Sequence, residues 1–436
     1  MTGKARAWRA SILHFLSDPG SGDDPRATEY FEDGLLVVAE GRVSAIGAAA
    51  ELLATLPRGT TITDCRPGLI VPGFIDTHIH YPQTDVIASF GTQLLDWLER
   101  YTFPAERRFA DPVHARAVSE FFLDELLRNG TTTALVFGTV HAQSVDAFFE
   151  AAKARGLRMI AGKVLMDRHC PDDLRDTPEE GFRESARLIE RWHGHARLGY
   201  AITPRFAITS SEEQLRLAGE LARAHPGVHV HTHVAENRAE VQWARDLFPW
   251  SRSYLDVYDH FGLLRERSVF AHCIHLDGED RKRMGESGAA AAFCPTSNLF
   301  LGSGFFDIDQ SDRAGIPIGL ATDVGGGTSF SMLRTLADGY KVAQGLGQSL
   351  GAKRAFYLAT LGGARALGLD NEIGNFRRGK EADFVVLDLA STPLLARRTA
   401  VATGIAEKLF ALMTLGDDRC VRQTFIMGSP ARFSAA

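Results

Sequence analysis

Two histidines in the first third of the chain are spaced so that both can bind one metal ion. His78 and His80 stand two residues apart at the end of Gly73–His80, an apolar segment that is typical of a β-strand. Alternate residues of a strand point to the same side, so the two imidazoles share one face. Imidazole nitrogens bind zinc at about 2.0–2.1 Å. Two satisfied core histidines are the alternative interpretation, and the later strand ends argue against it.

Four more side chains suited to metal or proton chemistry stand at the ends of later apolar segments. They are His233, Glu236, His272 and Asp323. Barrel enzymes carry their active sites at the carboxyl ends of the strands, so these side chains can meet over one opening. Together with the histidine pair, His233 and Asp323 form a candidate metal site. Glu236 and His272 remain for proton transfer, and a metal bound there lowers the pKa of its water towards 7, giving hydroxide at neutral pH.

Eight apolar segments alternate with helical ones through the middle of the chain, and these must be the strands that position the candidate site. The predicted strands are Gly73–His80, Thr132–Val140, Arg158–Asp167, Arg197–Pro204, Val228–Glu236, Ser268–Ile274, Ala290–Ser297 and Pro317–Asp323. Between them lie helical segments such as His114–Gly130, where Val118, Phe121, Phe122 and Leu126 follow helical spacing. The alternation predicts an α/β fold with a (β/α)₈ TIM-type barrel over residues 71–376. A doubly wound sheet would require a glycine-rich turn after the first strand, which instead ends in His-Ile-His.

The two ends of the chain have a different secondary-structure pattern, in which short strands alternate with turns. Gly34–Gly47 and Arg422–Phe433 are hairpin patterns, and Ala382–Leu389 is a strand pattern. We therefore expect residues 1–70 and 377–436 to form one small β-sandwich domain.

Composition narrows the class of protein. Of the 436 residues, 45% are hydrophobic and 23% are charged, which is ordinary for a folded globular chain. The net charge of −6 argues against nucleic acid as a partner. Five scattered cysteines without a C-x-x-C pair indicate reduced thiols. With neither a signal peptide nor a membrane-spanning segment in the pattern, we expect a cytoplasmic protein that does not bind membranes.

The strand ends also resemble a known group of enzymes. The segments 72–80, 233–237, 271–275 and 320–327 resemble the signature strand ends of the amidohydrolase superfamily, and 379–388 resembles its return into the small β domain. Finer motifs at 78–84, 94–106, 202–211, 231–241, 294–306 and 322–333 resemble the guanine deaminases within that superfamily. The resemblance implies hydrolysis of guanine at C2 to xanthine and ammonia, a step of purine catabolism.

The resemblance implies a role for each site residue. The metal ligands would be His78, His80, His233 and Asp323. Glu236 would protonate the ring and then the leaving amine, Asp323 would also take the proton of the attacking water, and His272 would orient that water. Gln83, Arg205 and Phe206 would hold the purine, and Trp97 would form a pocket wall.

The resemblance also implies how many metal ions each chain binds and whether the chains form an oligomer. Binuclear relatives use a bridging lysine on the fourth strand, which this chain lacks; Lys163 lies on the third. One zinc ion per chain is therefore expected, with iron equally compatible with such ligands. A homodimer is also implied.

Two other functions stay open at this point. One is deamination of a different nitrogen heterocycle, such as a triazine, a pterin or another purine. The other is a non-catalytic scaffold on the same fold. A separate motif, Gly374–Lys380, mimics a phosphate-binding loop, but Glu381 replaces the required Ser or Thr and a strand pattern follows, so a turn of the β domain is expected.

Overall fold

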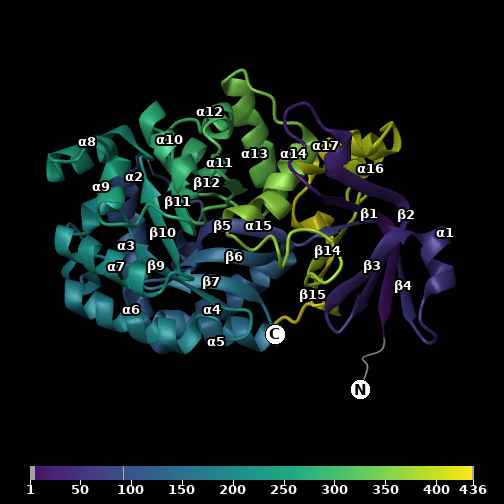
Figure 1. Cartoon of the computed structure of the whole chain (residues 1–436), viewed down its shortest axis with the longest axis horizontal. Coiled ribbons are helices and arrows are strands. Elements are labelled where there is room, and N and C mark those ends of the chain that lie inside the picture. Colours follow the sequence, from purple (N-terminus) through teal and green to yellow (C-terminus); the bar gives the residue numbers. More distant parts are fainter. Residues whose placement is uncertain (1–4, 92, 435–436) are drawn as a thin grey trace.

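The chain folds into a parallel barrel beside a smaller sheet. A computed structural model describes residues 5–91 and 93–434. The outermost residues of the predicted β domain, 1–4 and 435–436, lie outside this range. Figure 1 shows the barrel with its surrounding helices on one side and the small sheet, formed by the first and last parts of the chain, on the other. None of the described helices is long and apolar enough to cross a bilayer.

Eight parallel strands form the barrel wall, and each predicted strand is present. They are β5 (Phe74–His80), β6 (Thr131–Phe137), β7 (Arg158–Gly162), β9 (Gly199–Pro204), β10 (His229–Val234), β11 (Ser268–His272), β12 (Ala290–Phe293) and β13 (Ile318–Leu320), with the short β8 (Val164–Leu165) paired to β9. The first and last strands meet where Asp323 N–H donates to the His78 carbonyl at 3.0 Å and His80 N–H donates to the Val324 carbonyl at 2.9 Å. This junction closes the wall and brings β5 and β13 together at the candidate site.

The helices of this domain follow the barrel strands and mostly cover the outside of the wall, but the helix at 94–97 lines the pocket and the helix at 363–366 packs against the barrel interior. They are α2 (Leu94–Trp97), α3 (Phe103–Arg107), α4 (Pro112–Arg128), α5 (Ala142–Arg155), α6 (Pro178–Trp192), α7 (Glu212–Ala224), α8 (Arg238–Leu247), α9 (Tyr254–His260), α10 (Gly278–Ser287), α11 (Pro295–Phe300), α12 (Ile308–Arg313), α13 (Met332–Gly345), α14 (Ala352–Tyr357) and α15 (Gly363–Ala366). Short 3₁₀ or π segments are η1 (Pro25–Ala27), η2 (Leu53–Thr55), η3 (Tyr81–Val86), η4 (Leu98–Thr102), η5 (Arg108–Ala110), η6 (Asp172–Leu174), η7 (Ala207–Thr209), η8 (Leu358–Gly362) and η9 (Asp418–Cys420).

Helix α4 shows how local sequence sets these elements. The Asp111 side chain accepts the Val113 N–H and caps the first turn. Val118 and Phe122 are buried against the barrel, as the spacing predicts. Phe121 is not: it is 55% exposed, because one residue turns the side chain by about 100° around the helix, away from the buried stripe.

Both chain ends contribute to one seven-stranded sheet, in the order β16-β15-β14-β4-β1-β2-β3. Its strands are β1 (Arg6–Phe15), β2 (Thr28–Ala39), β3 (Arg42–Ala48), β4 (Thr61–Pro72), β14 (Phe384–Leu387), β15 (Val421–Ile426) and β16 (Ser429–Pro430); α1 (Ala49–Leu52) follows β3, and α16 (Pro393–Ala400) and α17 (Ile405–Leu415) lie between β14 and β15.

The small sheet is folded over its own core. The Trp8 ring of β1 lies 5.1 Å from that of Phe384 and 5.5 Å from that of Phe425, although β4 separates β1 from their strands. Neighbouring strands are about 4.8 Å apart, so these rings meet across the intervening strand on one face of the sheet. The predicted hairpin at 34–47 is β2–β3, which turns at Glu40 and Gly41, both with positive φ.

A buried ionic network fastens the small sheet to the barrel. Glu381, just before β14, accepts from Arg158 at 2.5 and 2.8 Å and from Arg197 at 2.7 and 3.0 Å. Arg197 also pairs with Asp383. The two arginines stand at the amino ends of β7 and β9. The network therefore holds the sheet against the amino-terminal end of the barrel.

Glu381→Gln is expected to lower the free energy of unfolding by about 3–5 kcal/mol, because it removes the carboxylate partner of buried Arg158 and leaves Arg197 with Asp383 alone. Urea denaturation followed by circular dichroism measures the change. Glu220→Gln, which removes an exposed partner of Arg216, is the control and should cost less than about 1 kcal/mol. Equal losses for the two variants would contradict the role given to the network.

Candidate metal and acid–base site

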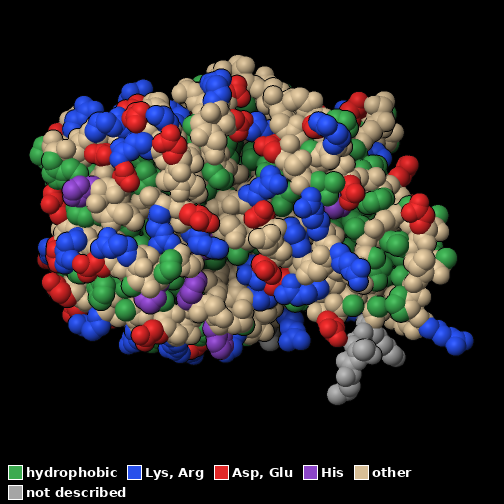
Figure 2. All heavy atoms as spheres, in the orientation of Figure 1, with side chains coloured by type: hydrophobic (Ala, Val, Ile, Leu, Met, Phe, Trp, Pro, Cys, Tyr) green, Lys and Arg blue, Asp and Glu red, His purple; other side chains and the backbone are tan. Residues whose placement is uncertain are grey.

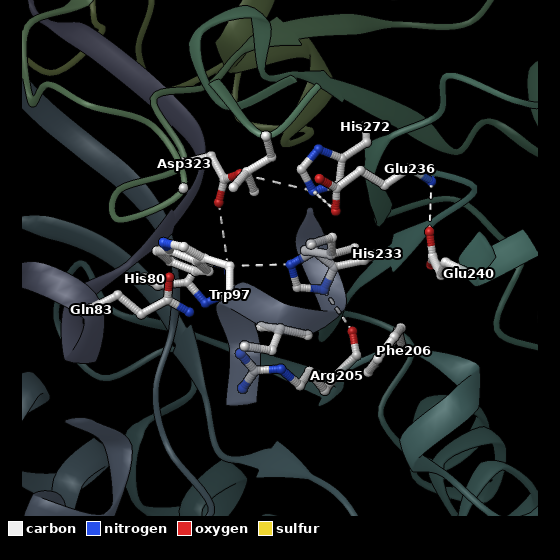
Figure 3. A pocket seen from close by; sticks show the side chains of 14 residues that line it. His80, Gln83, Trp97, Arg205, Phe206, His233, Glu236, Glu240, His272 and Asp323 are labelled. Carbon is white, nitrogen blue, oxygen red and sulfur yellow. Dashed lines mark hydrogen bonds and ion pairs between the residues drawn. The ribbon is translucent and has the colours of Figure 1, made fainter. Parts of the chain in front are cut away.

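Three imidazoles and one carboxylate converge at the carboxyl ends of β5, β10 and β13. The Nε2 atom of His80 lies 3.2 Å from Nε2 of His78 and 3.2 Å from Nε2 of His233. Asp323 Oδ1 lies 3.1 Å from His78 Nε2 and 3.4 Å from His80 Nε2. Figure 3 shows the labelled His80, His233 and Asp323 pointing toward one another. The structure thus brings together all four side chains that the sequence analysis groups as metal ligands.

This arrangement fits a divalent metal ion. Ligand atoms bound tetrahedrally at about 2.0–2.1 Å are about 3.3 Å from each other, which matches the four separations of 3.1–3.4 Å among these side chains. In the part of the chain that the structure describes, the side chains that could hold a metal form two overlapping groups, one of His78, His80 and His233 and one of His78, His272 and Asp323. Burial lowers the pKa of His80 and of His233 well below the ordinary value, so both rings are neutral, and the neutral imidazole is the form that binds metals. The cluster can therefore hold a metal without first losing protons from these rings.

The far nitrogens of two of these rings are also held. His233 Nδ1 lies 2.6 Å from the Arg205 carbonyl; a carbonyl only accepts, so Nδ1 carries the hydrogen and Nε2 is free to bind a metal. His78 Nδ1 lies 2.7 Å from His231 Nε2. The sequence left the role of His231 open, and the structure places it directly behind His78. Such outer contacts fix the orientation of metal-binding histidines.

Glu236 and His272 lie beside the cluster as an acid–base pair. Glu236 Oε2 is 3.3 Å from His272 Nε2, whose ring is 3.9 Å from Asp323 Oδ2. Glu236 is only 2% exposed, and burial raises the pKa of its carboxyl to about 7 despite the opposing effect of His272. A carboxyl with that pKa can give or take a proton at neutral pH.

Two residues that the sequence analysis did not assign hold this pair in place. Ser303 Oγ donates to Glu236 Oε1 at 2.8 Å, and His272 Nδ1 lies 2.9 Å from Asn298 Oδ1. His275, whose role was also open, lies 3.0 Å from the Ser303 carbonyl through Nε2. Ser303 and Asn298 belong to the motif at 294–306, which was their only signal in the sequence.

The backbone conformation at the strand ends helps to direct the side chains of the site toward the opening. Ala235, His272 and Asp323 all have φ between +50° and +72°, a region that residues other than glycine seldom adopt. Each stands where a barrel strand ends, two of them within the site itself. Held strain of this kind is concentrated at functional sites, and here it turns the chain sharply so that the strand-end side chains face the opening.

The side chains expected to hold the substrate line the same pocket. Gln83, Trp97, Arg205 and Phe206 share a cavity with His80, His233, Glu236, His272 and Asp323. Gln83 Oε1 accepts the Gly325 N–H at 3.2 Å, and Trp97 Nε1 donates to the Ser89 carbonyl at 3.3 Å. Both side chains are thereby held in fixed positions on the pocket wall.

Glu106 does not line the pocket but holds Arg205, which does, and the sequence analysis assigned it no role. Arg205 donates through one guanidinium nitrogen to both Glu106 oxygens, at 2.9 and 2.8 Å. Gln83 Nε2 lies 3.4 Å from Glu106 Oε1. The buried charge of Arg205 is balanced by an equally buried carboxylate. The motif at 94–106 ends on Glu106, yet its separation of 99 positions from Arg205 hides the contact.

Lys163 forms its ion pairs outside the metal cluster. Its side chain is fully buried and forms an ion pair with Asp176. Its Nζ atom also lies 3.5 Å from Oε2 of Glu184 in α6. Neither of the possible metal-binding groups among the described residues includes its partners. This position leaves the metal cluster without a bridging lysine.

Comparison with known proteins places the chain in a family. The model of the amidohydrolase family matches residues 69–430. Guanine deaminase of Escherichia coli (strain K12) is 52% identical over 402 residues, 92% of each chain. The solved structure of E. coli guanine deaminase gives a TM-score of 0.96 at 49% identity and covers 99% of this chain and 100% of that one. Guanine deaminase from C. acetobutylicum, solved with guanine in its active site, gives 0.88 at 27% identity, covering 98% and 100%. The chain belongs to the amidohydrolase family.

Proposed function

We propose that this chain is a guanine deaminase, which hydrolyses guanine at C2 to xanthine and ammonia. The observation that carries the proposal is one pocket that joins a metal-binding cluster, a carboxyl with a pKa near 7 and a fixed arginine–glutamine pair. The similarity to guanine deaminases over nearly the whole chain supports it.

The metal would be held by four side chains, and zinc is the proposed ion. They are His78, His80, His233 and Asp323. One such ion, when bound, lowers the pKa of a water molecule and fixes its position for attack. We propose one ion per chain, because Lys163 is paired with Asp176 and cannot bridge a second.

The protein's own groups move the protons. Asp323 takes a proton from the attacking water, and His272, between Asp323 and Glu236, orients that water. Glu236 gives its proton to ring nitrogen N3, which removes the aromatic resistance to attack at C2. The water oxygen bonds to C2, and Glu236 then takes the proton of the new hydroxyl group and gives it to the amine. The bond from C2 to the amine breaks and ammonia leaves, and the proton held by Asp323 returns Glu236 to its acid form. Xanthine therefore keeps one hydrogen of the water and ammonia carries the other.

The purine is held by donors and an aromatic face. The Arg205 guanidinium has only donors, and the Gln83 amide can turn one toward the same place, so both suit the carbonyl at C6. Glu106 fixes the guanidinium and neutralises it when the pocket is empty. Phe206 can lie against the ring plane and Trp97 forms the wall. A role in purine catabolism and a homodimer remain predictions from the family resemblance, and a cytoplasmic location remains a prediction from the sequence pattern.

The purified protein, supplied with Zn²⁺, tests the function directly. Incubation with guanine should give xanthine and ammonia in equal amounts, measured by ultraviolet absorbance and an ammonia assay. Adenine, a pterin and an aminotriazine serve as the comparison substrates. Turnover of the pterin or triazine with guanine left unchanged would contradict the proposal.

Metal content is a separate prediction. Elemental analysis should find one tightly bound divalent ion per chain, because the four ligand side chains surround a single position. His80→Ala should lose most of the metal, while His195→Ala, an exposed histidine outside the site, should retain it. Two tightly bound ions, or a His80→Ala protein that keeps a full complement, would contradict the mononuclear arrangement.

A further inference from the structure

A second cavity, of about 420 Å³, lies at the junction of the barrel and the small sheet. Its charged lining consists of Arg42, Arg365, Arg377, Arg378, Lys380, Asp370 and Glu372. Five basic residues against two acidic ones give this cavity a positive charge in a chain whose net charge is −6. Figure 2 shows Lys and Arg side chains gathered near this junction.

The cavity is distinct from the candidate metal site. It is bordered by η8 and α15 and by the segment that leads into β14. Directly after α15, the Leu367 carbonyl lies 2.8 Å from Nε2 of His229, the first residue of β10. The cavity is therefore at the amino-terminal end of the barrel, whereas the metal cluster is at the carboxyl ends of the strands.

The basic side chains are in excess of their partners. Asp370 is 3.9 Å from Arg365, and Glu372 is 3.6 Å from Arg42. Within residues 5–91 and 93–434, Arg377, Arg378 and Lys380 have no carboxylate within 4.0 Å. Charges of one sign in a concave surface attract and concentrate counter-ions.

Lys380 is the most unusual of the three. Only 7% of the residue is exposed, and its Nζ donates to the Ile373 carbonyl at 3.1 Å. Burial lowers its pKa to about 8. A buried ammonium that lacks a carboxylate partner is costly, and an anion in the cavity would offset that cost.

The segment that carries these cations is fixed before any ligand arrives. Val43 N–H donates to the Lys380 carbonyl, and Gly379 N–H donates to the Val43 carbonyl, both at 2.8 Å. Arg42 donates to the Gly379 carbonyl at 2.8 Å. These bonds tie the motif 374–380 to β3 as a turn of the β domain, as the sequence predicted. Preorganised groups bind a ligand without first being ordered.

We propose that this cavity binds a small phosphorylated molecule. Planar guanidinium groups donate two parallel hydrogen bonds to phosphate oxygens, and Arg377 and Arg378 are exposed and free to do so. A volume of about 420 Å³ falls in the range of small-molecule sites and exceeds the need of a lone inorganic ion. The motif is no nucleotide-binding P-loop, because the strand β14 follows it and no helix begins there.

Calorimetric titration with ribose 5-phosphate tests the proposal, with ribose as the uncharged match and ionic strength held constant with KCl. Neither probe carries a purine, and a pair of double variants separates binding in the cavity from binding of phosphate oxygens at the candidate metal site. We expect saturable binding of ribose 5-phosphate and none of ribose. Inorganic phosphate should bind more weakly than the sugar phosphate, because it fills less of the cavity.

The decisive comparison is between two double variants that remove the same charge. Arg377→Ala/Arg378→Ala should weaken binding of ribose 5-phosphate by about tenfold or more, since each charged hydrogen bond contributes on that scale. Arg58→Ala/Arg187→Ala, at exposed positions away from the cavity, should leave it unchanged. Equal weakening in both, equal binding of ribose, or no binding to the unchanged protein up to about 10 mM would overturn the proposal. All three chains should share one melting temperature without ligand, which excludes misfolding as the cause.

Discussion

Glu236→Gln should lower kcat for guanine by about 10²–10⁴-fold, the range of a general acid–base group, while the metal stays bound. The substitution keeps the size of the side chain and the hydrogen bond from Ser303, but it removes the proton that N3 needs. Steady-state kinetics with guanine and elemental analysis of the same sample measure the two outcomes. Glu266→Gln, at an exposed position, is the matched control.

The role of Glu236 as the acid also predicts the direction in which kcat/KM changes with pH. Burial raises the pKa of the Glu236 carboxyl to about 7, so the acid form is present below that pH and is lost above it. We therefore expect kcat/KM of the unchanged enzyme to fall as the pH rises through about 7, and Glu236→Gln to lack that decline. Near-normal turnover in Glu236→Gln would show that another group supplies the proton.

Guanine should be deaminated on the order of 10³-fold more efficiently than adenine. Adenine carries an amine at C6, whose hydrogens would face the donors of Arg205 and Gln83, and an unsatisfied buried donor costs several kcal/mol. The ratio of kcat/KM for the two purines measures the discrimination. Comparable activity on both would contradict this account of specificity.

Two variants separate the contribution of Arg205 to substrate binding from the contribution of the buried Arg205–Glu106 pair to stability. Arg205→Leu should reduce guanine kcat/KM mainly through a higher KM, with metal retained, because the side chain lines the pocket proposed for the purine and is not one of the proposed metal ligands. Arg205→Leu/Glu106→Leu removes the carboxylate that the single variant leaves unpaired. Recovery of thermal stability without recovery of kcat/KM in the double variant is the expected result. Unchanged kcat/KM in Arg205→Leu would remove Arg205 from the specificity pocket.

The convergence of the candidate metal and proton residues could be predicted from sequence because it follows simple geometric rules. His78 and His80 share a face through the two-residue period of a strand, and Asp323 is at the end of the last predicted strand. A closed barrel turns those linear positions into one cluster. The position of each such residue could be predicted once its own segment was correctly assigned as a strand.

The residues that could not be predicted depend on contacts between distant loops. Glu106 meets Arg205, and Ser303 meets Glu236, only after the helices have packed around the barrel. No periodicity marks such positions, and each is an ordinary polar residue in the sequence. The positive φ of His272 and Asp323 is equally invisible, because residue type predicts extended backbone there.

The position of β4 in the small sheet has a consequence for how the chain is made. β4 pairs with β1 on one side and with β14 on the other, with Phe384 opposite Pro72. During synthesis, β1 to β4 leave the ribosome first, and the inner edge of β4 has no partner until the whole barrel has followed. An unpaired strand edge is a template for association between chains. Rapid closure of the barrel therefore shortens the time during which a half-built sheet is open to aggregation.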